Sequence, residues 1–123
     1  MHIKNINVAL IGNPNVGKTS VFNRLTGLNQ QVGNYPGITV EKKIGYCKLP
    51  HHHLANILDL PGTYSLNASS IDENVVIELL LNKNEKLYPD VVLVVTEVEN
   101  LKRNLLLFTQ IKDLEIPTIL VIN

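Results

Sequence analysis

A glycine pattern near the amino end of the chain restricts the possible folds more than any other feature. Gly12 and Gly17 enclose four residues, and Lys18 and Thr19 follow them directly. An apolar, strand-like run ends just before the pattern, and apolar residues at helical spacing begin just after it. A glycine turn between a buried strand and a helix points successive backbone N–H groups at one anion, next to the positive end of the helix dipole. This order predicts a phosphate-binding loop.

The chemistry of such a loop, known as a P-loop, gives its residue types separate roles. Lys18 supplies a positive point charge for the β and γ phosphates, and the Thr19 hydroxyl is a ligand for Mg²⁺. The pattern alone does not separate GTPases from ATPases or small-molecule kinases. The residues that we expect around the phosphates are Gly12, Asn13, Pro14, Asn15, Val16, Gly17, Lys18, Thr19 and Ser20.

A second motif favours a GTPase. The residues Asp59, Leu60, Pro61 and Gly62 follow a predicted strand and are expected to reach the nucleotide. The Asp59 carboxylate would hold Mg²⁺ through water, and the Gly62 N–H would meet a γ phosphate. Lys18 and Gly62 are therefore candidate catalytic residues.

A long loop is expected at residues 28–39, because this polar segment contains glycine and proline and has no sustained period. Loops of this length in compact domains tend to be functional. Its last residues, Gly37, Ile38 and Thr39, are expected to contact the nucleotide. The Thr39 hydroxyl can move onto Mg²⁺ when a triphosphate is bound, which makes Thr39 a candidate catalytic residue and the loop a candidate switch.

The apolar blocks along the chain predict an α/β fold with a mostly parallel sheet and one antiparallel edge strand. Helical spacing and caps predict helices from Lys18 to Gly27, from the Ser70–Glu73 capping box onward, and over 101–114. Short apolar runs predict strands at 6–11, 40–49, 54–60, 91–95 and 116–122. The strands at 40–49 and 54–60 are expected to form the antiparallel hairpin.

Composition narrows the class of protein further. A chain of 123 residues is long enough for one domain. Lys+Arg 11 balances Asp+Glu 11, so we expect no nucleic-acid partner held by charge. No apolar run reaches the roughly 18 residues that a membrane span needs.

Three segments together closely resemble the N-terminal G domain of the ferrous iron transport protein B (FeoB) family. They run from Gly12 to Asn23, from Val32 to Glu41 and from Asp59 to Leu66, and residues 100–105 look like the third helix of the family. The similarity covers essentially the whole chain, and its middle segment is more distinctive than the P-loop. The resemblance implies a P-loop NTPase of the Ras-like G-domain type, with GTP as substrate and Mg²⁺ and K⁺ as cofactors.

The resemblance also implies a biological role. In this family a GTPase at the cytoplasmic face of the bacterial inner membrane regulates Fe²⁺ uptake through a transmembrane permease region of the same chain. Potassium stimulates hydrolysis, and Asn15 matches the side chain that helps to bind K⁺, with backbone carbonyls from Gly33 to Tyr35 completing the site. Asn15 is therefore also a candidate catalytic residue. Homo-oligomerisation of the full-length protein stays open.

The sequence departs from the family pattern at several positions. Thr63 stands where Ras-like GTPases place a glutamine that orients the attacking water, so we expect slow intrinsic hydrolysis. Tyr35 stands where the family commonly has tryptophan. Asn123 would be only the first residue of the guanine-recognition segment Asn-x-x-Asp. Residues 1–123 are therefore expected to be a G domain truncated at the start of that motif.

Two other functions stay open on the sequence alone. Potassium-dependent GTPases of tRNA modification or ribosome assembly share Asn-rich P-loops, although a basic surface would be expected for them. Thr63 would also suit a nucleotide-gated binding module with negligible hydrolysis. The run of His51, His52 and His53 offers imidazoles that can bind Fe²⁺. Three consecutive turn residues point in different directions, so we expect a solvated loop there.

Overall fold

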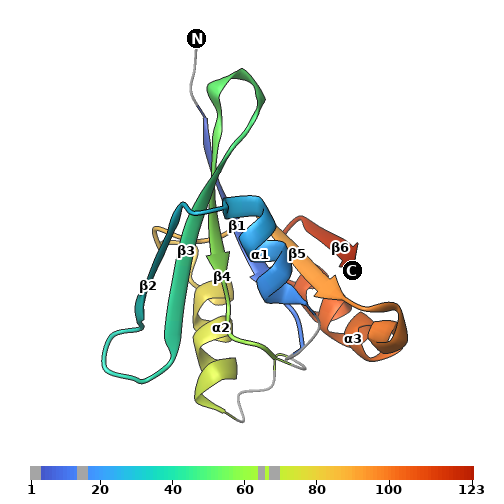
Figure 1. Cartoon of the computed structure of the whole chain (residues 1–123). Helices are drawn as coiled ribbons and strands as arrows, with labels where there is room; N and C mark the ends of the chain where they lie inside the picture. The colour runs from blue at the N-terminus through green and yellow to red at the C-terminus, as the bar shows by residue number, and fades with distance from the viewer. Residues whose placement is uncertain (1–3, 14–16, 64–65, 67–69) are drawn as a thin grey trace.

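The computed structural model describes residues 4–13, 17–63, 66 and 70–123 (Figure 1). Strands and helices alternate along the chain, and the described strands form one sheet with the order β2-β3-β4-β1-β5-β6. The elements are β1 (Asn5–Ile11), α1 (Lys18–Thr26), β2 (Gln30–Asn34), β3 (Glu41–Lys48), the short 3₁₀ helix η1 (Pro50–His52), β4 (Leu54–Asp59), α2 (Ile71–Leu81), β5 (Val91–Thr96), the short 3₁₀ helix η2 (Val98–Asn100), α3 (Leu101–Lys112) and β6 (Thr118–Ile122).

The centre of the sheet is parallel, as the sequence predicts. Strand β1 pairs in parallel with both β4 and β5, and β5 pairs in parallel with β6. Strands buried on both faces are apolar almost throughout, and Leu10 and Ile11 of β1 and Val92 of β5 are fully buried. The predicted α/β class is thus confirmed.

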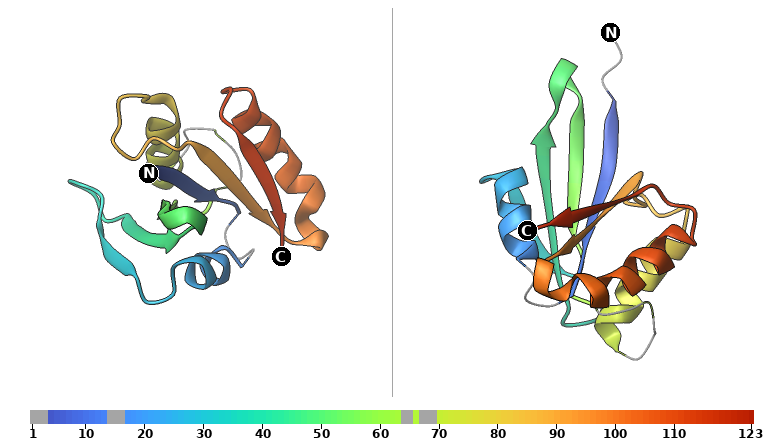
Figure 2. Two further views of the ribbon diagram at one scale, coloured as in Figure 1. Left: turned by 90° about the horizontal axis from the view of Figure 1, so that it is seen from above. Right: turned by 90° about the vertical axis from the view of Figure 1, so that its right-hand side faces the viewer.

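The helices cover both faces of this sheet (Figure 2). On one face, Phe22 of α1 packs with Val8, Leu10 and Ile57. On the other face, α2 and α3 enclose a larger core, to which they contribute Val76, Leu80, Leu107 and Ile111. Two packed layers on one sheet are the expected way for an α/β domain to bury its apolar residues.

The prediction of a loop over residues 28–39 is wrong in part. Gln30–Asn34 form β2, which pairs antiparallel with β3 and places Asn34 opposite Glu41. The side chains of this strand are mostly exposed, so no alternation of apolar and polar residues marks it in the sequence. Strand β2 forms through backbone pairing with β3, and it is the antiparallel edge strand of the sheet. The sequence predicts instead that the edge strand belongs to the hairpin of β3 and β4.

The remaining elements lie close to their predicted positions. Helix α2 begins after Ser70, whose side chain accepts a hydrogen bond from the Glu73 N–H at 3.1 Å, and this confirms the predicted capping box. Helix α1 ends at Gly27, which has a positive φ of 59°. Among the described residues, no helix is both long and apolar enough to cross a bilayer.

Candidate functional site

The parallel pairing brings the carboxyl ends of β1, β4, β5 and β6 to one edge of the sheet. Two backbone hydrogen bonds join the turn after β4 to the end of β1. The Leu60 N–H donates to the Leu10 carbonyl at 3.0 Å, and the Thr63 N–H donates to the Gly12 carbonyl at 2.8 Å. The predicted Asp-x-x-Gly turn therefore lies against the start of the glycine loop. Ligands of open α/β sheets bind at such strand ends.

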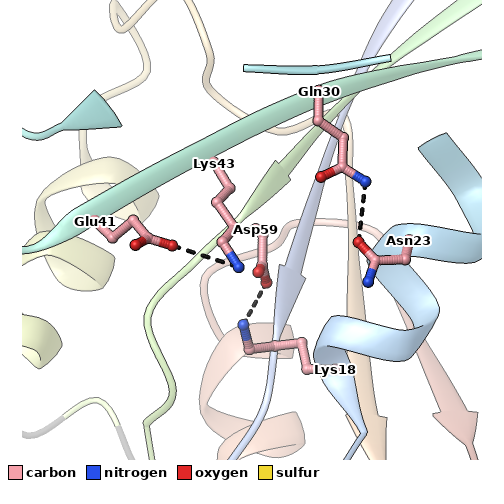
Figure 3. A network of polar contacts seen from close by, with 6 residues as sticks. All are labelled: Lys18, Asn23, Gln30, Glu41, Lys43 and Asp59. Carbon is pink, nitrogen blue, oxygen red and sulfur yellow. Dashed lines mark hydrogen bonds and ion pairs between the residues drawn. The ribbon is translucent and has the colours of Figure 1, made fainter. Parts of the chain in front are cut away.

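An ion pair links the two motifs (Figure 3). The Lys18 ammonium, on the first residue of α1, contacts a carboxylate oxygen of Asp59, the last residue of β4. The two side chains are only 12% and 6% exposed. A carboxylate with so little access to water needs a nearby cation, and Lys18 supplies it. The fold thus brings together two residues that the sequence assigns to the same nucleotide site, Lys18 for the phosphates and Asp59 for Mg²⁺.

A cavity of about 290 Å³ opens beside this ion pair. Five of the residues that line it were predicted from the sequence: Lys18, Thr39, Asp59, Leu60 and Pro61. Sequence reasoning missed three charged lining residues, Glu41, Lys43 and Asp72. The register of the predicted hairpin would have been the signal for Lys43, because this residue lies directly opposite Asp59.

Gly17 caps the amino end of α1 with a positive φ of 81°, and it has a second close neighbour. A Cβ atom placed on Gly17 would lie 2.0 Å from Nδ2 of Asn123, so a larger residue there would require the Asn123 side chain to move. The Asn123 N–H donates to the Thr96 carbonyl at 2.7 Å, which fixes the residue at the end of β6. Asn123 is a predicted site residue that is far from the glycine loop in the sequence, and it packs against that loop in the fold.

Other loop residues differ in accessibility. Gly12 and Asn13 are buried, and the Oδ1 atom of Asn13 has no hydrogen-bond partner among the described residues. Thr19 and Ser20 are exposed on the first turn of α1. The predicted site residues Pro14, Asn15 and Val16 lie outside the described residues.

The oxygen atoms at this edge suit a magnesium ion. Asp59 contributes a carboxylate and Thr39 a hydroxyl to the same cavity, and Thr19 presents a second exposed hydroxyl next to Lys18. Hard oxygen ligands of this kind are the ones that Mg²⁺ prefers, usually together with substrate phosphates and water. The residues present therefore fit the predicted ion.

The backbone carbonyls predicted for a potassium site are not gathered at the glycine loop. Gly33 and Asn34 belong to β2, which β3 and β4 separate from β1. The Tyr35 N–H donates to the Val40 carbonyl at 3.0 Å and closes the hairpin. In this conformation Gly33 and Asn34 lie on one edge strand of the sheet, β2, and β6 is the strand at the other edge.

Tyr35 anchors the tip of this hairpin on the α2 side of the sheet. It lines a second cavity, of about 410 Å³, together with Ile38, Leu58 and Leu79. The Tyr35 hydroxyl is buried without a hydrogen-bond partner among the described residues. Burial, with the negative charge of Asp59 as a smaller cause, raises the pKa of Tyr35 to about 12.

The histidine run has a structural contact. His51 and His52 adopt positive φ angles of 61° and 64°, and the His53 Nδ1 atom accepts a hydrogen bond from the Lys4 N–H at 2.9 Å. Within the described ranges, no group of three or more His, Cys, Asp or Glu residues is arranged to hold a metal ion.

The sheet order, the glycine loop and the cavity with Lys18 and Asp59 define a P-loop domain. A family model described as "Ferrous iron transport protein B" matches residues 6–123. The chain belongs to the ferrous iron transport protein B family.

Individual relatives agree with this assignment. The Fe(2+) transporter FeoB of Leptospira biflexa is 47% identical over 120 residues, which are 98% of this chain and 17% of the relative. The Shigella flexneri Fe(2+) transporter FeoB is 42% identical over an alignment of 125 residues that covers 98% of this chain and 16% of that protein. The chain therefore spans only about a sixth of the length of these relatives.

Solved structures match the fold as well. The G domain of the T. maritima FeoB iron transporter matches with a TM-score of 0.84 and 44% identity, over 98% of this chain and 72% of that one. A mutant of S. thermophilus NFeoB bound to GDP also matches with a TM-score of 0.84 and 44% identity, over 98% of this chain and 44% of that one. The predicted G-domain fold is confirmed.

Proposed function

We propose that this domain binds GTP with Mg²⁺, hydrolyses it slowly and acts as a switch in Fe²⁺ uptake. The observation that carries the proposal is the meeting of Lys18, Thr39 and Asp59 around one cavity at the end of the glycine loop. The GDP-bound S. thermophilus structure, 44% identical, supports a guanine nucleotide as the ligand. We further propose that residues 1–123 are the amino-terminal part of a G domain.

The chain offers a set of groups for each part of the nucleotide. The backbone N–H groups of the loop from Gly12 to Gly17 would bind phosphate oxygens, and Lys18 would leave Asp59 to meet the β and γ phosphates. Asn123 would approach the base from its position against Gly17. Further expected contacts come from Asn13, Pro14, Asn15, Val16, Ser20, Gly37, Ile38, Leu60 and Pro61.

Thr19, Thr39 and Asp59 would hold the metal, and Gly62 would sense the γ phosphate. Bound Mg²⁺ neutralises phosphate charge in such sites. Thr39 is exposed and lies two residues before β3. Its contact with the metal would require the triphosphate, so the segment around Thr39 would be ordered before hydrolysis and released after it.

The potassium proposal requires a rearrangement of β2. Asn15 is the side chain expected to bind K⁺, and the carbonyls of Gly33 to Tyr35 would have to leave the β2–β3 pairing to reach it. A monovalent cation there would offset negative charge that develops between the phosphates. Thr63 is 1% exposed, so its short side chain is poorly placed to orient water, which supports slow hydrolysis.

The link to iron rests on the relatives, which are named Fe(2+) transporters. We propose that the domain regulates a transmembrane permease region of its own full-length chain, at the cytoplasmic face of the bacterial inner membrane. Family membership favours this partner over tRNA or ribosomes. The competing function is a binding module with negligible hydrolysis.

Measuring GTP hydrolysis in potassium and in sodium buffer tests the proposal. The protein is the chain extended past Asn123 through the end of its G domain. We expect faster turnover in potassium, and we expect Asn15→Ala to abolish this difference while the exposed control Asn84→Ala retains it. Equal and negligible turnover in both salts, with GTP still bound, would favour the binding module.

A further inference from the structure

Lys43 lies in the candidate site, although no part of the P-loop pattern includes it. In the antiparallel pairing of β3 with β4, Lys43 is directly opposite Asp59. Residues directly opposite each other in such a pair carry their side chains on the same face of the sheet, with Cβ atoms about 5 Å apart. Lys43 and Asp59 accordingly line the same cavity, and Figure 3 shows the Lys43 side chain directed toward the Asp59 carboxylate.

The present partner of Lys43 holds it only weakly. The Lys43 ammonium lies 3.4 Å from a carboxylate oxygen of Glu41, and the Glu41 side chain is 57% exposed. Ion pairs that are this open to solvent contribute little, because water screens the charges and two long side chains must be ordered. Lys43 can therefore exchange Glu41 for another anion at small cost.

Asp59 faces the opposite situation. Its carboxylate is almost buried, and its ion-pair partner in the described part of the chain is Lys18. Under the proposed function, phosphates draw Lys18 away from Asp59. Removing one partner of a buried ion pair leaves an uncompensated charge, which is strongly unfavourable. Binding of nucleotide ahead of the metal would then be penalised unless another cation replaced Lys18.

We propose that Lys43 is that cation, a positioning residue that takes over Asp59 when phosphate engages Lys18. Lys43 would compensate the charge of the carboxylate and keep it directed into the cavity until a divalent ion takes its place. This inference rests on the proposed nucleotide binding. It predicts that Lys43 matters for nucleotide binding without metal and matters little once Mg²⁺ is present.

Titration of GDP into the extended chain, once in EDTA and once in saturating Mg²⁺, tests this prediction. We expect Lys43→Met to weaken GDP binding about tenfold in EDTA and less than about twofold in Mg²⁺, because the metal then compensates Asp59. Lys43→Arg keeps the positive charge and should restore most of the affinity in EDTA. Lys42→Met is the matched control, since the Lys42 ammonium lies 5.4 Å from the Tyr35 ring centroid, in the neighbouring cavity.

The outcomes are separable. Equal losses of affinity with and without Mg²⁺, or no loss in EDTA, would overturn the role of Lys43. A lower melting temperature of Lys43→Met without nucleotide would instead indicate a purely structural contact. If the unmodified chain fails to bind GDP in either buffer, the proposed function itself fails, independently of Lys43.

Discussion

At the scale of single residues, Gly17 meets two separate demands. Its φ of 81° lies in the left-handed region, and a Cβ atom would collide with the Asn123 amide. The first demand follows from the sequence pattern, because a P-loop needs glycine at this position. The second could not be predicted, because it depends on where β6 ends relative to the loop.

Comparing Gly17→Ala with Gly27→Ala in the extended chain separates backbone strain, which both variants share, from effects specific to the glycine loop. Gly27 also has a positive φ, but no atom lies within 4 Å of a Cβ placed there. We expect each substitution to lower the free energy of unfolding by about 1–3 kcal/mol through backbone strain. Only Gly17→Ala should also weaken GDP binding, by more than about tenfold in a titration. Similar GDP affinities for the two variants would contradict the proposed binding of phosphate by the loop that ends at Gly17.

Tyr35 gives a prediction about pH. Its pKa in the folded chain is about 12, above the ordinary value of 10.0. The folded state therefore holds the phenol proton more tightly than the unfolded state, so the associated stability is present below pH 10 and falls as the pH rises toward 12. Tyr35→Phe should lose less stability than the unmodified chain between pH 9 and pH 11 in chemical denaturation.

At pH 7 the same variant should be equally stable or slightly more stable, because it removes a buried hydroxyl that has no partner among the described residues. The exposed Tyr46, changed to Phe, controls for loss of a phenol in general. A Tyr35→Phe chain that loses stability at high pH as steeply as the unmodified chain would show that Tyr35 is not the group that titrates.

At the scale of secondary-structure elements, the sequence predicts the helices and strands in which burial selects apolar residues at regular positions. Strands β1 and β5 are apolar runs, and helices α1 and α3 have apolar residues at helical spacing, so their positions follow from the pattern. Strand β2 escapes prediction because its residues are polar and mostly exposed. Its position is set by backbone hydrogen bonds to β3, which leave no trace in hydrophobicity.

Among the described helices, α2 is the one whose start carries a side-chain cap. Ser70 accepts a hydrogen bond from the Glu73 N–H, and its own hydroxyl lies 3.3 Å from a Glu73 carboxylate oxygen. Ser70→Ala should lower the free energy of unfolding by about 1 kcal/mol, whereas Ser70→Asp, which can still accept this bond, should retain most of it. Denaturant titrations of both variants would measure this difference. Equal losses for Ala and Asp would contradict the hydrogen bond from the Glu73 N–H as the source of this stability.

At the scale of the whole molecule, the parallel sheet order explains why residues from four parts of the sequence meet. Gly12, Asp59, Thr96 and Asn123 each follow or end a strand, and these strand ends share one edge of the sheet. The motifs place Lys18 and Asp59 at one nucleotide site, but they do not predict the ion pair between them. The motifs do not predict the position of Lys43, because this position follows from strand register. They also do not predict where Gly33 to Tyr35 lie, because the sequence pattern does not reveal β2.

The most direct test of the account is GTP binding by the extended chain in Mg²⁺, for the unmodified protein and for Lys18→Met, with ATP as competitor. We predict that GTP binds, that ATP does not displace it at equal concentration, and that Lys18→Met weakens binding more than about tenfold because a charge-assisted phosphate contact is lost. Thermal unfolding without nucleotide would show whether the variant still folds. Equal GTP affinity of a folded Lys18→Met variant and the unmodified chain would contradict the assignment of this cavity as the phosphate site.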